Sequence, residues 1–290
     1  MVRYVSQELD NRFARNRESF DLLGKERSRT IVDLALENYL AEQAGTQDGD
    51  TGMDATFKNA AVCQIRTFLF AGHDTSSSTL CYCYHLLSIH PQVRTKVIEE
   101  HNRTLGASIG QAAPQLIENP HLLNQLPYTS AVIKETLRLY PPASSTRNGE
   151  AGFMVTTPDG RQLPTEGFLI WSNHVAIHRN PDYWPQPDDF LPERWLVENP
   201  DPLLPEAKGA WRAFEYGPRN CIGQELAMLE IRLVLALTLR EFTIESAYDV
   251  WDEMTLPKGP KTVNGDRAYQ ILLGAAHPSD GYPCKVFMNS

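Results

Sequence analysis

Apolar residues recur at helical spacing near the C-terminal end of the chain. Leu226, Leu229, Leu233 and Leu237 follow one another at three- or four-residue steps, with charged residues interspersed. Such steps place apolar side chains along one face of an α-helix, where they can face a core. The pattern therefore predicts a core helix over residues 224–241.

A longer helical pattern runs from about Thr56 to Ile89, and a shorter one lies around Thr30–Leu40. Between them, Thr46–Gly52 is polar and of low complexity, which predicts a loop. A further helix ends within Leu137–Pro142, because a double proline cannot continue a helix. These patterns predict that long helices dominate the fold.

Strand patterns are short and lie toward the C-terminal half. Apolar residues flank Pro158-Asp-Gly160 within Phe153–Ile170, which predicts a hairpin. Phe242–Ile244 and Ala268–Leu273 have strand character, whereas Trp171–Arg179 resembles a short helix. We therefore expect a mostly α fold with small β-sheets.

Composition and charge narrow the class of protein. The chain of 290 residues is 42% hydrophobic and 22% charged, which is typical of a soluble globular protein. Its net charge of −9 argues against nucleic acid as a partner. Five cysteines at irregular spacing predict no disulfide framework and fit a reducing compartment. Met1–Arg17 is polar and charged, so it is neither a signal peptide nor a membrane span.

Cys221 lies in the stretch Phe214–Gly223, directly before the predicted core helix. A helix N-terminus and nearby cations favour the thiolate form of cysteine, which is the form that binds metals. Gly217 and Gly223 permit a tight turn and a close approach of the backbone to a flat ring. Arg219 can reach a carboxylate at the edge of such a ring. For the cysteine alone, a buried and inert residue in a Gly-Pro turn is the alternative.

The whole stretch Phe-x-x-Gly-x-Arg-x-Cys-x-Gly resembles the haem-binding loop of the cytochrome P-450 haem-thiolate monooxygenases. The resemblance implies haem b as the cofactor, with Cys221 as the axial ligand of its iron. It also implies that the other fixed residues of the loop contact the cofactor, namely Phe214, Gly217, Arg219 and Gly223. The order of the motifs is similar to that of fungal secondary-metabolism members.

A second motif, Ala71–Ser76, is similar to the family's oxygen-activation site on its long central helix. The resemblance implies that Ala71 and Gly72 contact the cofactor, and that Asp74 and Thr75 relay protons during O₂ cleavage. Gly72 weakens the helix interior and nearby hydroxyls compete for backbone hydrogen bonds, so we expect a local opening of the helix. An N-cap or a solvated helix face is the alternative for the Asp-Thr pair.

A third motif places Glu135 and Arg138 one helical turn apart, and Arg194 follows in Phe190–Trp195. These segments resemble the family's Glu-x-x-Arg helix and its Pro-Glu-Arg segment. The resemblance implies a buried charged network that holds the Cys221 loop in register. An exposed helix ion pair of little consequence is the alternative.

The extended stretch after the predicted helix carries the remaining candidates. The resemblance implies that Arg147 binds a haem propionate. It also implies that Ser144, Ser145 and Thr146 line the substrate pocket.

The resemblance covers about the C-terminal half of a complete family member, so residues 1–290 are expected to form a single truncated domain. The N-terminal half, with its membrane anchor in eukaryotic members, is expected to be absent. A fragment, a truncated gene product and a shortened gene model are the alternatives. The expected parts are a helical lead-in and polar loop (1–54), the long oxygen-activation helix (55–90), the Glu-x-x-Arg helix and following strand (126–147), a Pro- and Asp-rich meander and the haem-binding loop (180–223), a helix (224–241) and the C-terminal strands (242–290).

Three hypotheses of function follow from the resemblance. The first is a monooxygenase that inserts one oxygen atom of O₂ into a small lipophilic organic substrate. The second is an inactive or regulatory remnant, and the third is an isomerase or dehydratase that uses haem without O₂. The proton relay favours the first hypothesis over the third, whereas the chain length favours the second.

The resemblance also implies a redox partner and a location. Electrons would come from an NADPH-dependent flavoprotein reductase that docks near Cys221. A basic patch there would comprise Arg94, Lys96, Arg103 and Arg212, although such residues more often only solvate a surface. Family members lie on the cytosolic face of the endoplasmic reticulum membrane, but this chain has the sequence character of a soluble, cytoplasmic protein.

Overall fold

The computed structural model describes residues 2–19, 30–43, 52–196, 209–255 and 261–289. The chain divides into two compact units, Met1–His73 and Asp74–Ser290, which are treated separately below. Most of the predicted polar loop over Thr46–Gly52 lies outside the described residues.

The first unit consists of α1 (Val2–Ser19), α2 (Ile31–Gln43) and the beginning of α3 (Ala55–Ile89). α2 begins where it does because Thr30 and Asp33 cap it reciprocally: the Asp33 N–H donates to Thr30 Oγ1 over 3.2 Å, and the Thr30 N–H donates to Asp33 Oδ2 over 3.0 Å. The helices enclose a small core of Val5, Leu9, Leu36 and Val62.

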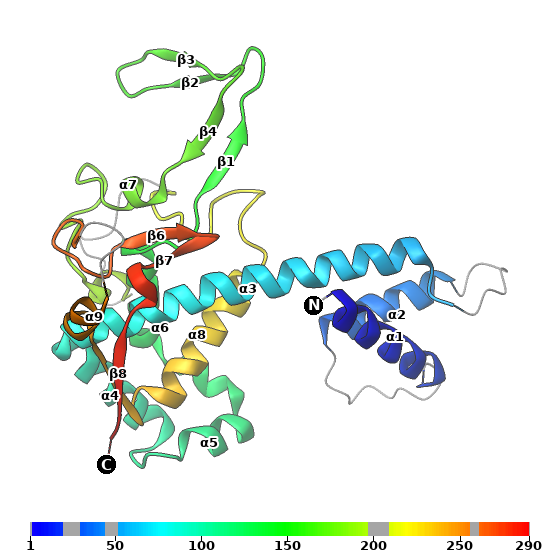
Figure 1. The fold of residues 1–290 in the computed structure, drawn as a ribbon, viewed down its shortest axis with the longest axis horizontal. Helices are drawn as coiled ribbons and strands as arrows, with labels where there is room; N and C mark the ends of the chain where they lie inside the picture. Colours follow the sequence, from blue (N-terminus) through cyan, green and yellow to red (C-terminus); the bar gives the residue numbers. More distant parts are fainter. Residues whose placement is uncertain (1, 20–29, 44–51, 197–208, 256–260, 290) are drawn as a thin grey trace. The chain divides into compact units, whose positions relative to one another are not determined.

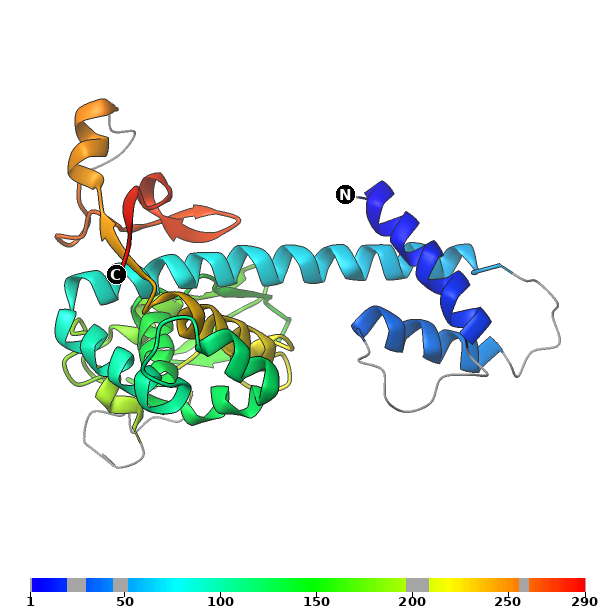
Figure 2. The same cartoon turned by 90° about the horizontal axis from the view of Figure 1, so that it is seen from below.

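The helices of the second unit surround a larger core. α6 (Pro127–Leu139) and α8 (Gln224–Thr238) lie side by side, as Figures 1 and 2 show. Ile231 and Leu235 of α8 pack against Ile133 and Leu137 of α6. The buried face of α8 therefore differs from the predicted leucine face, of which Leu226 and Leu229 are 58% and 40% exposed. The other helices are α4 (Pro91–Leu105), α5 (Ala112–Glu118), α7 (His174–His178), α9 (Tyr248–Met254) and the 3₁₀ turns η1 (Pro120–Gln125), η2 (Pro192–Trp195) and η3 (Ser279–Gly281).

The strands pair two by two into antiparallel ladders (Figure 1). β6 and β7 are joined by a tight turn at Gly274, whereas β1 pairs with β4 around the β2–β3 hairpin. The strands are β1 (Ser145–Asn148), β2 (Met154–Thr156), β3 (Gln162–Pro164), β4 (Leu169–Ser172), β5 (Phe242–Ser246), β6 (Gln270–Leu273), β7 (Ala275–Pro278) and β8 (Cys284–Met288). The prediction of a mostly α fold with small β-sheets is confirmed.

Of two local predictions, one agrees with the structure and the other differs from it. The hairpin predicted around Pro158–Gly160 is present as β2 and β3, and Gly160 adopts the positive φ of +82° that its turn requires. The short helix predicted over Trp171–Arg179 is present but begins later, at His174. Trp171 belongs to β4, and α7 begins only after Asn173, whose side chain accepts the Ala176 N–H over 3.3 Å as an N-cap.

The predicted opening of the long helix near Gly72 is wrong. α3 is continuous from Ala55 to Ile89. Hydroxyls close to Gly72 bond back to carbonyls of the preceding turn without breaking the helix: Ser77 Oγ donates to the Asp74 carbonyl over 3.1 Å and Thr79 Oγ1 to the Thr75 carbonyl over 2.8 Å.

Candidate functional site

The loop Phe214–Gly223 is closed by its own backbone. The Cys221 N–H donates to the Phe214 carbonyl over 2.8 Å, and the Asn220 N–H donates to the Gly217 carbonyl over 3.1 Å. Gly217 has a φ of +86°, a conformation that favours glycine, as the predicted tight turn requires. Cys221 therefore sits at the end of the closed loop, just before α8 begins.

The Cys221 thiol is exposed, so it is not the inert core residue of the alternative reading. Gly223, unlike Gly217, shows no requirement for glycine. Its φ of −85° suits any residue, and a Cβ at this position would stand 3.8 Å from the Cys221 sulfur, which is an ordinary van der Waals contact. The neighbours Ile222 and Leu226 are 89% and 58% exposed, so apolar surface lies beside the sulfur.

A single thiol is a poor site for a bare metal ion, because protein metal sites use several donors. Among the described residues, no group of three or more His, Cys, Asp or Glu side chains could hold an ion. An exposed thiol with apolar neighbours instead fits a metal that carries its other ligands in a flat ring. Arg219 is exposed two residues before Cys221 and suits an acidic group on such a ring. The residues of the loop thus fit haem.

Behind the loop lies a charged network in which Glu135, Arg138 and Arg194 are all fully buried. The Arg138 guanidinium donates to both Glu135 oxygens over 2.8 and 2.9 Å. Arg194 Nε donates to Glu135 Oε1 over 2.9 Å. The structure brings the three predicted residues together, and the exposed ion pair of the alternative reading is excluded.

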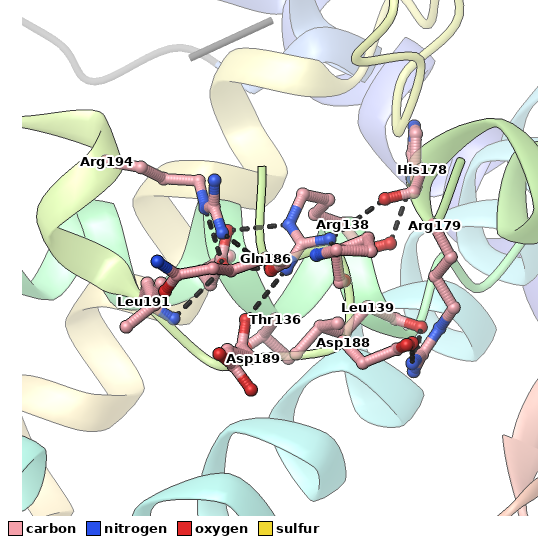
Figure 3. Close-up of polar contacts among 12 residues, drawn as sticks. Thr136, Arg138, Leu139, His178, Arg179, Gln186, Asp188, Asp189, Leu191 and Arg194 are labelled. Carbon is pink, nitrogen blue, oxygen red and sulfur yellow. Dashed lines mark hydrogen bonds and ion pairs between the residues drawn. The ribbon is translucent and has the colours of Figure 1, made fainter. Parts of the chain in front are cut away.

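This network carries two guanidinium groups for one carboxylate, so backbone carbonyls satisfy the excess donors. Arg138 donates to the His178 carbonyl over 2.8 Å, as Figure 3 shows. It also donates to the Pro187 carbonyl over 2.6 Å. Arg194 donates to the Gln186 carbonyl over 3.2 Å. Burial lowers the pKa of Arg194, an effect that the Glu135 charge opposes. The network therefore ties α6 to the segment between α7 and the Cys221 loop.

Sequence reasoning missed His178, which connects this network to the loop. His178 Nδ1 lies 3.0 Å from the Arg138 carbonyl, and its Nε2 accepts the backbone N–H of Arg212 over 2.8 Å. The available signal was the four-residue spacing of His174 and His178, which puts both imidazoles on one face of α7.

The predicted acid Asp74 is half-buried on α3 and contacts the C-terminal hairpin. Its Oδ2 accepts the Ala275 N–H over 2.7 Å, and its Oδ1 lies 3.1 Å from His277 Nε2. Asp74 is therefore neither an N-cap nor a solvated residue. Thr75 follows it on α3 and is also half-buried.

The candidates that follow α6 are mostly engaged within the chain. Arg147 lies on β1, exposed, and donates to the Thr146 carbonyl over 2.8 Å. Ser144 Oγ accepts from Trp171 Nε1 over 2.6 Å, and the Ser145 hydroxyl donates to Glu215. Each of these two hydroxyls thus has a partner within the protein, and their place in a substrate pocket stays a prediction.

Two residues of the predicted basic patch pair with carboxylates of the protein itself. Lys96 pairs with Glu193 over 2.6 Å, and Arg212 pairs with Glu215 over 2.6 Å. Arg94 donates to Thr243 Oγ1 over 3.2 Å. A docking patch and ordinary surface cations both stay open as interpretations of these residues.

No helix within the described ranges combines the length and the apolar character needed to cross a bilayer.

Comparisons with known proteins agree with the geometry of the loop. The family model described as cytochrome P450 matches residues 1–273. Cytochrome P450 monooxygenase polC of Polytolypa hystricis is 45% identical over 265 residues, which cover 90% of this chain and 47% of polC. Cytochrome P450 monooxygenase acrF of Aspergillus aculeatus is 42% identical over 283 residues, which cover 89% of this chain and 56% of acrF. The chain thus spans about half the length of these relatives.

Solved structures share the fold. The crystal structure of a cytochrome P450 (CYP102L1) superposes with a TM-score of 0.68 at 24% identity, covering 99% of this chain and 56% of that one. Haem b, bound through a cysteine thiolate, is the cofactor of these proteins. The match of the family model over most of the chain and the fungal relatives lead to one conclusion: the chain belongs to the cytochrome P450 family.

Proposed function

We propose that this protein provides the haem-binding part of a monooxygenase that inserts one oxygen atom of O₂ into a small lipophilic organic substrate. The observation that carries the proposal is the exposed Cys221 thiol, held in a closed loop directly before α8. In this proposal an NADPH-dependent flavoprotein reductase supplies the electrons. The fungal origin of polC and acrF supports a place among fungal enzymes of secondary metabolism.

Cys221 would hold the cofactor as its thiolate, in a loop where Phe214 packs toward the core and Gly217 makes the turn. When bound, haem supplies an iron centre at which O₂ is activated, and the thiolate ligand favours O–O cleavage. Arg219 and Arg147 would bind the carboxylates at the ring edge, because guanidinium groups form charge-assisted bonds with carboxylates. Gly223 would contact the cofactor, as the resemblance implies.

Asp74 and Thr75 would move protons in the reaction, and Ala71 and Gly72 would contact the cofactor, as the resemblance implies. Gly72 has no atom within 4 Å of where a Cβ would lie. The Asp74 carboxylate would take up a proton from water and, as the carboxylic acid, pass it to the Thr75 hydroxyl, which would give up its own proton to the reaction in turn. For this step Asp74 has to exchange its bond with the Ala275 N–H or with His277 for one with water.

The buried network of Glu135, Arg138 and Arg194 has a structural role in this proposal. Its donors and acceptors are satisfied internally, so it holds the segment before the Cys221 loop in one arrangement. It has no part in the transfer of protons or electrons.

The two other hypotheses make different predictions. An isomerase or dehydratase needs no proton relay for O₂ cleavage, so the acid–alcohol pair Asp74 and Thr75 favours the monooxygenase. A remnant would keep the loop without haem chemistry, and the span of about half of polC and acrF is the observation in its favour. For the whole protein we propose a location on the cytosolic face of the endoplasmic reticulum membrane.

Isotopically labelled dioxygen separates these functions. Purified protein is incubated with reductase, NADPH and a panel of lipophilic compounds, and the products are analysed by mass spectrometry. A monooxygenase incorporates one labelled oxygen atom per product molecule. Turnover without label would indicate the isomerase or dehydratase, and the absence of both haem and turnover would indicate the remnant.

A further inference from the structure

Glu215, the second residue of the Cys221 loop, has an unusual conformation for its type. Its φ is +63°, in the left-handed region that non-glycine residues rarely adopt. Its side chain is only 11% exposed, although it is charged. Both features require compensating contacts, since an unpaired buried carboxylate is unstable.

The Glu215 carboxylate receives hydrogen bonds from several parts of the second unit. Oε1 accepts from the Ser145 hydroxyl of β1 and lies 3.3 Å from His174 Nε2 of α7. Oε2 accepts from Arg212 Nε over 3.0 Å and Nη2 over 2.6 Å, and from the Tyr216 N–H over 3.1 Å. One side chain thus joins a strand, a helix and the approach to the loop.

These contacts are oriented by their own neighbours. His174 Nδ1 lies 2.9 Å from the Ala143 carbonyl, which fixes the plane of the imidazole. The backbone of Arg212 donates to His178, which contacts the Arg138 carbonyl of the charged network. Burial raises the pKa of Glu215, but the bonds from Ser145, Arg212 and His174 outweigh it and hold the pKa at about 2. Glu215 is therefore a fixed anion at neutral pH.

The rest of the loop has little anchoring of its own. Residues 216–222 are all exposed, Cys221 among them. Phe214 packs toward the core formed by α6 and α8, and its carbonyl accepts the Cys221 N–H. The side chains that fix the loop to the rest of the unit are thus at its beginning, at Phe214 and Glu215.

We propose that Glu215 is a positioning residue for Cys221, which locks the start of the loop to β1, α7 and Arg212 and thereby sets the direction of the thiol. The inference rests on the proposed function in one respect, the use of that thiol as the haem ligand. A carboxylate suits this position because Oε2 faces N–H donors of Arg212 and Tyr216, which have no acceptor atom to offer an amide NH₂. Glu215→Gln can place only its oxygen there, and it removes the negative charge opposite the Arg212 guanidinium, so the charge-assisted bonds to Arg212 are lost.

The first test needs no cofactor. Hydrogen exchange of the purified chain is followed peptide by peptide for wild type, Glu215→Gln and the control Glu225→Gln, an exposed glutamate of α8. We expect the amides of residues 214–223 to exchange about tenfold faster in Glu215→Gln, since the charged bonds that fix the loop are lost. Peptides of α6 and α8 and the control variant should keep wild-type rates. Unchanged exchange over 214–223 would overturn the proposal, as would an equal acceleration throughout the chain.

The second test uses haem-loaded protein and the carbon monoxide spectrum of the reduced form. Wild type and Glu225→Gln should show the red-shifted band of a thiolate ligand, whereas Glu215→Gln should lose at least half of it to the band of non-thiolate ligation. A Glu215→Gln spectrum identical to wild type would refute the positioning role. If wild type itself takes up no haem, the proposed function fails, and the exchange test alone decides the role of Glu215.

A milder variant covers the case in which Glu215→Gln does not fold. Ser145→Ala removes one of the bonds to the carboxylate and leaves Arg212 in place. It should shift exchange of residues 214–223 and the band ratio in the same direction by a smaller factor. A Ser145→Ala protein that matches wild type in both measurements would count against the lock.

Discussion

His178 provides a quantitative test of the arrangement behind the loop, through its resistance to protonation. The residue is fully buried. Its Nδ1–H donates to the Arg138 carbonyl over 3.0 Å, and its Nε2 accepts the Arg212 N–H over 2.8 Å. A second proton would have to go on Nε2 and would break the bond with Arg212. Burial accordingly lowers the pKa of His178 to about 3, with the nearby charges of His174, Arg138 and Arg212 acting in the same direction and the Arg138 carbonyl opposing.

The sign of the resulting pH dependence follows from proton counting. In the unfolded chain histidine has a pKa of about 6.5. Between that pH and about 3 the unfolded state binds one more proton at this position than the folded state. The free energy of unfolding therefore falls as the pH is lowered through this window. From pH 7 to pH 5 the contribution of His178 amounts to a loss of about 2 kcal/mol.

Urea unfolding followed by circular dichroism at pH 7 and pH 5 measures this loss. His178→Gln should be less stable than wild type at pH 7, but its stability should fall by about 2 kcal/mol less on going to pH 5. Burial also lowers the pKa of His101, to about 4, and this contribution cancels because both proteins contain it. His121→Gln, at an exposed position of η1, is the control and should keep the wild-type fall. An equal fall in His178→Gln would show that the reasoning about His178 is wrong.

Other predictions concern the network, the turn and the relay. Arg138→Met should lower the free energy of unfolding by about 3–5 kcal/mol, because it leaves buried Glu135 and several carbonyls with fewer donors; the exposed Arg161→Met is its control, and equal stabilities in urea would contradict the prediction. Gly217→Ala should cost about 1 kcal/mol or more, since its φ of +86° disfavours a side chain; a wild-type urea midpoint would show that the turn relaxes freely. Thr75→Ala should uncouple O₂ consumption from product formation in the full enzyme, and equal coupling would remove Thr75 from the mechanism.

The sequence predicted those elements whose pattern is local. The helices α8 and α3 could be predicted because an α-helix repeats its pattern of apolar and polar positions every turn. The hairpin β2–β3 was legible from one turn signal at Pro158–Gly160. The spacing of Glu135 and Arg138 predicts that they meet one helical turn apart, whereas the convergence of Arg194 with them came from the resemblance.

Long-range contacts explain what the sequence did not reveal. Glu215 adopts a left-handed backbone because Ser145 and Arg212 hold its carboxylate, and nothing in the residues around it signals those partners. Asp74 contacts His277, which lies 203 residues further along the chain, and nothing in the residues around Asp74 signals that partner either. The start of α7 was misplaced because the Asn173 cap outweighed the apolar run before it.

The central claim is that the Cys221 sulfur binds the iron of haem, and the reduced carbon monoxide spectrum tests it most directly. Purified wild-type protein should carry haem and show the red-shifted band of a thiolate ligand. Cys221→Ala should lose that band, while Cys284→Ala, at another exposed cysteine, should retain it. A red-shifted band that persists in Cys221→Ala, or its absence from haem-loaded wild type, would contradict the assignment.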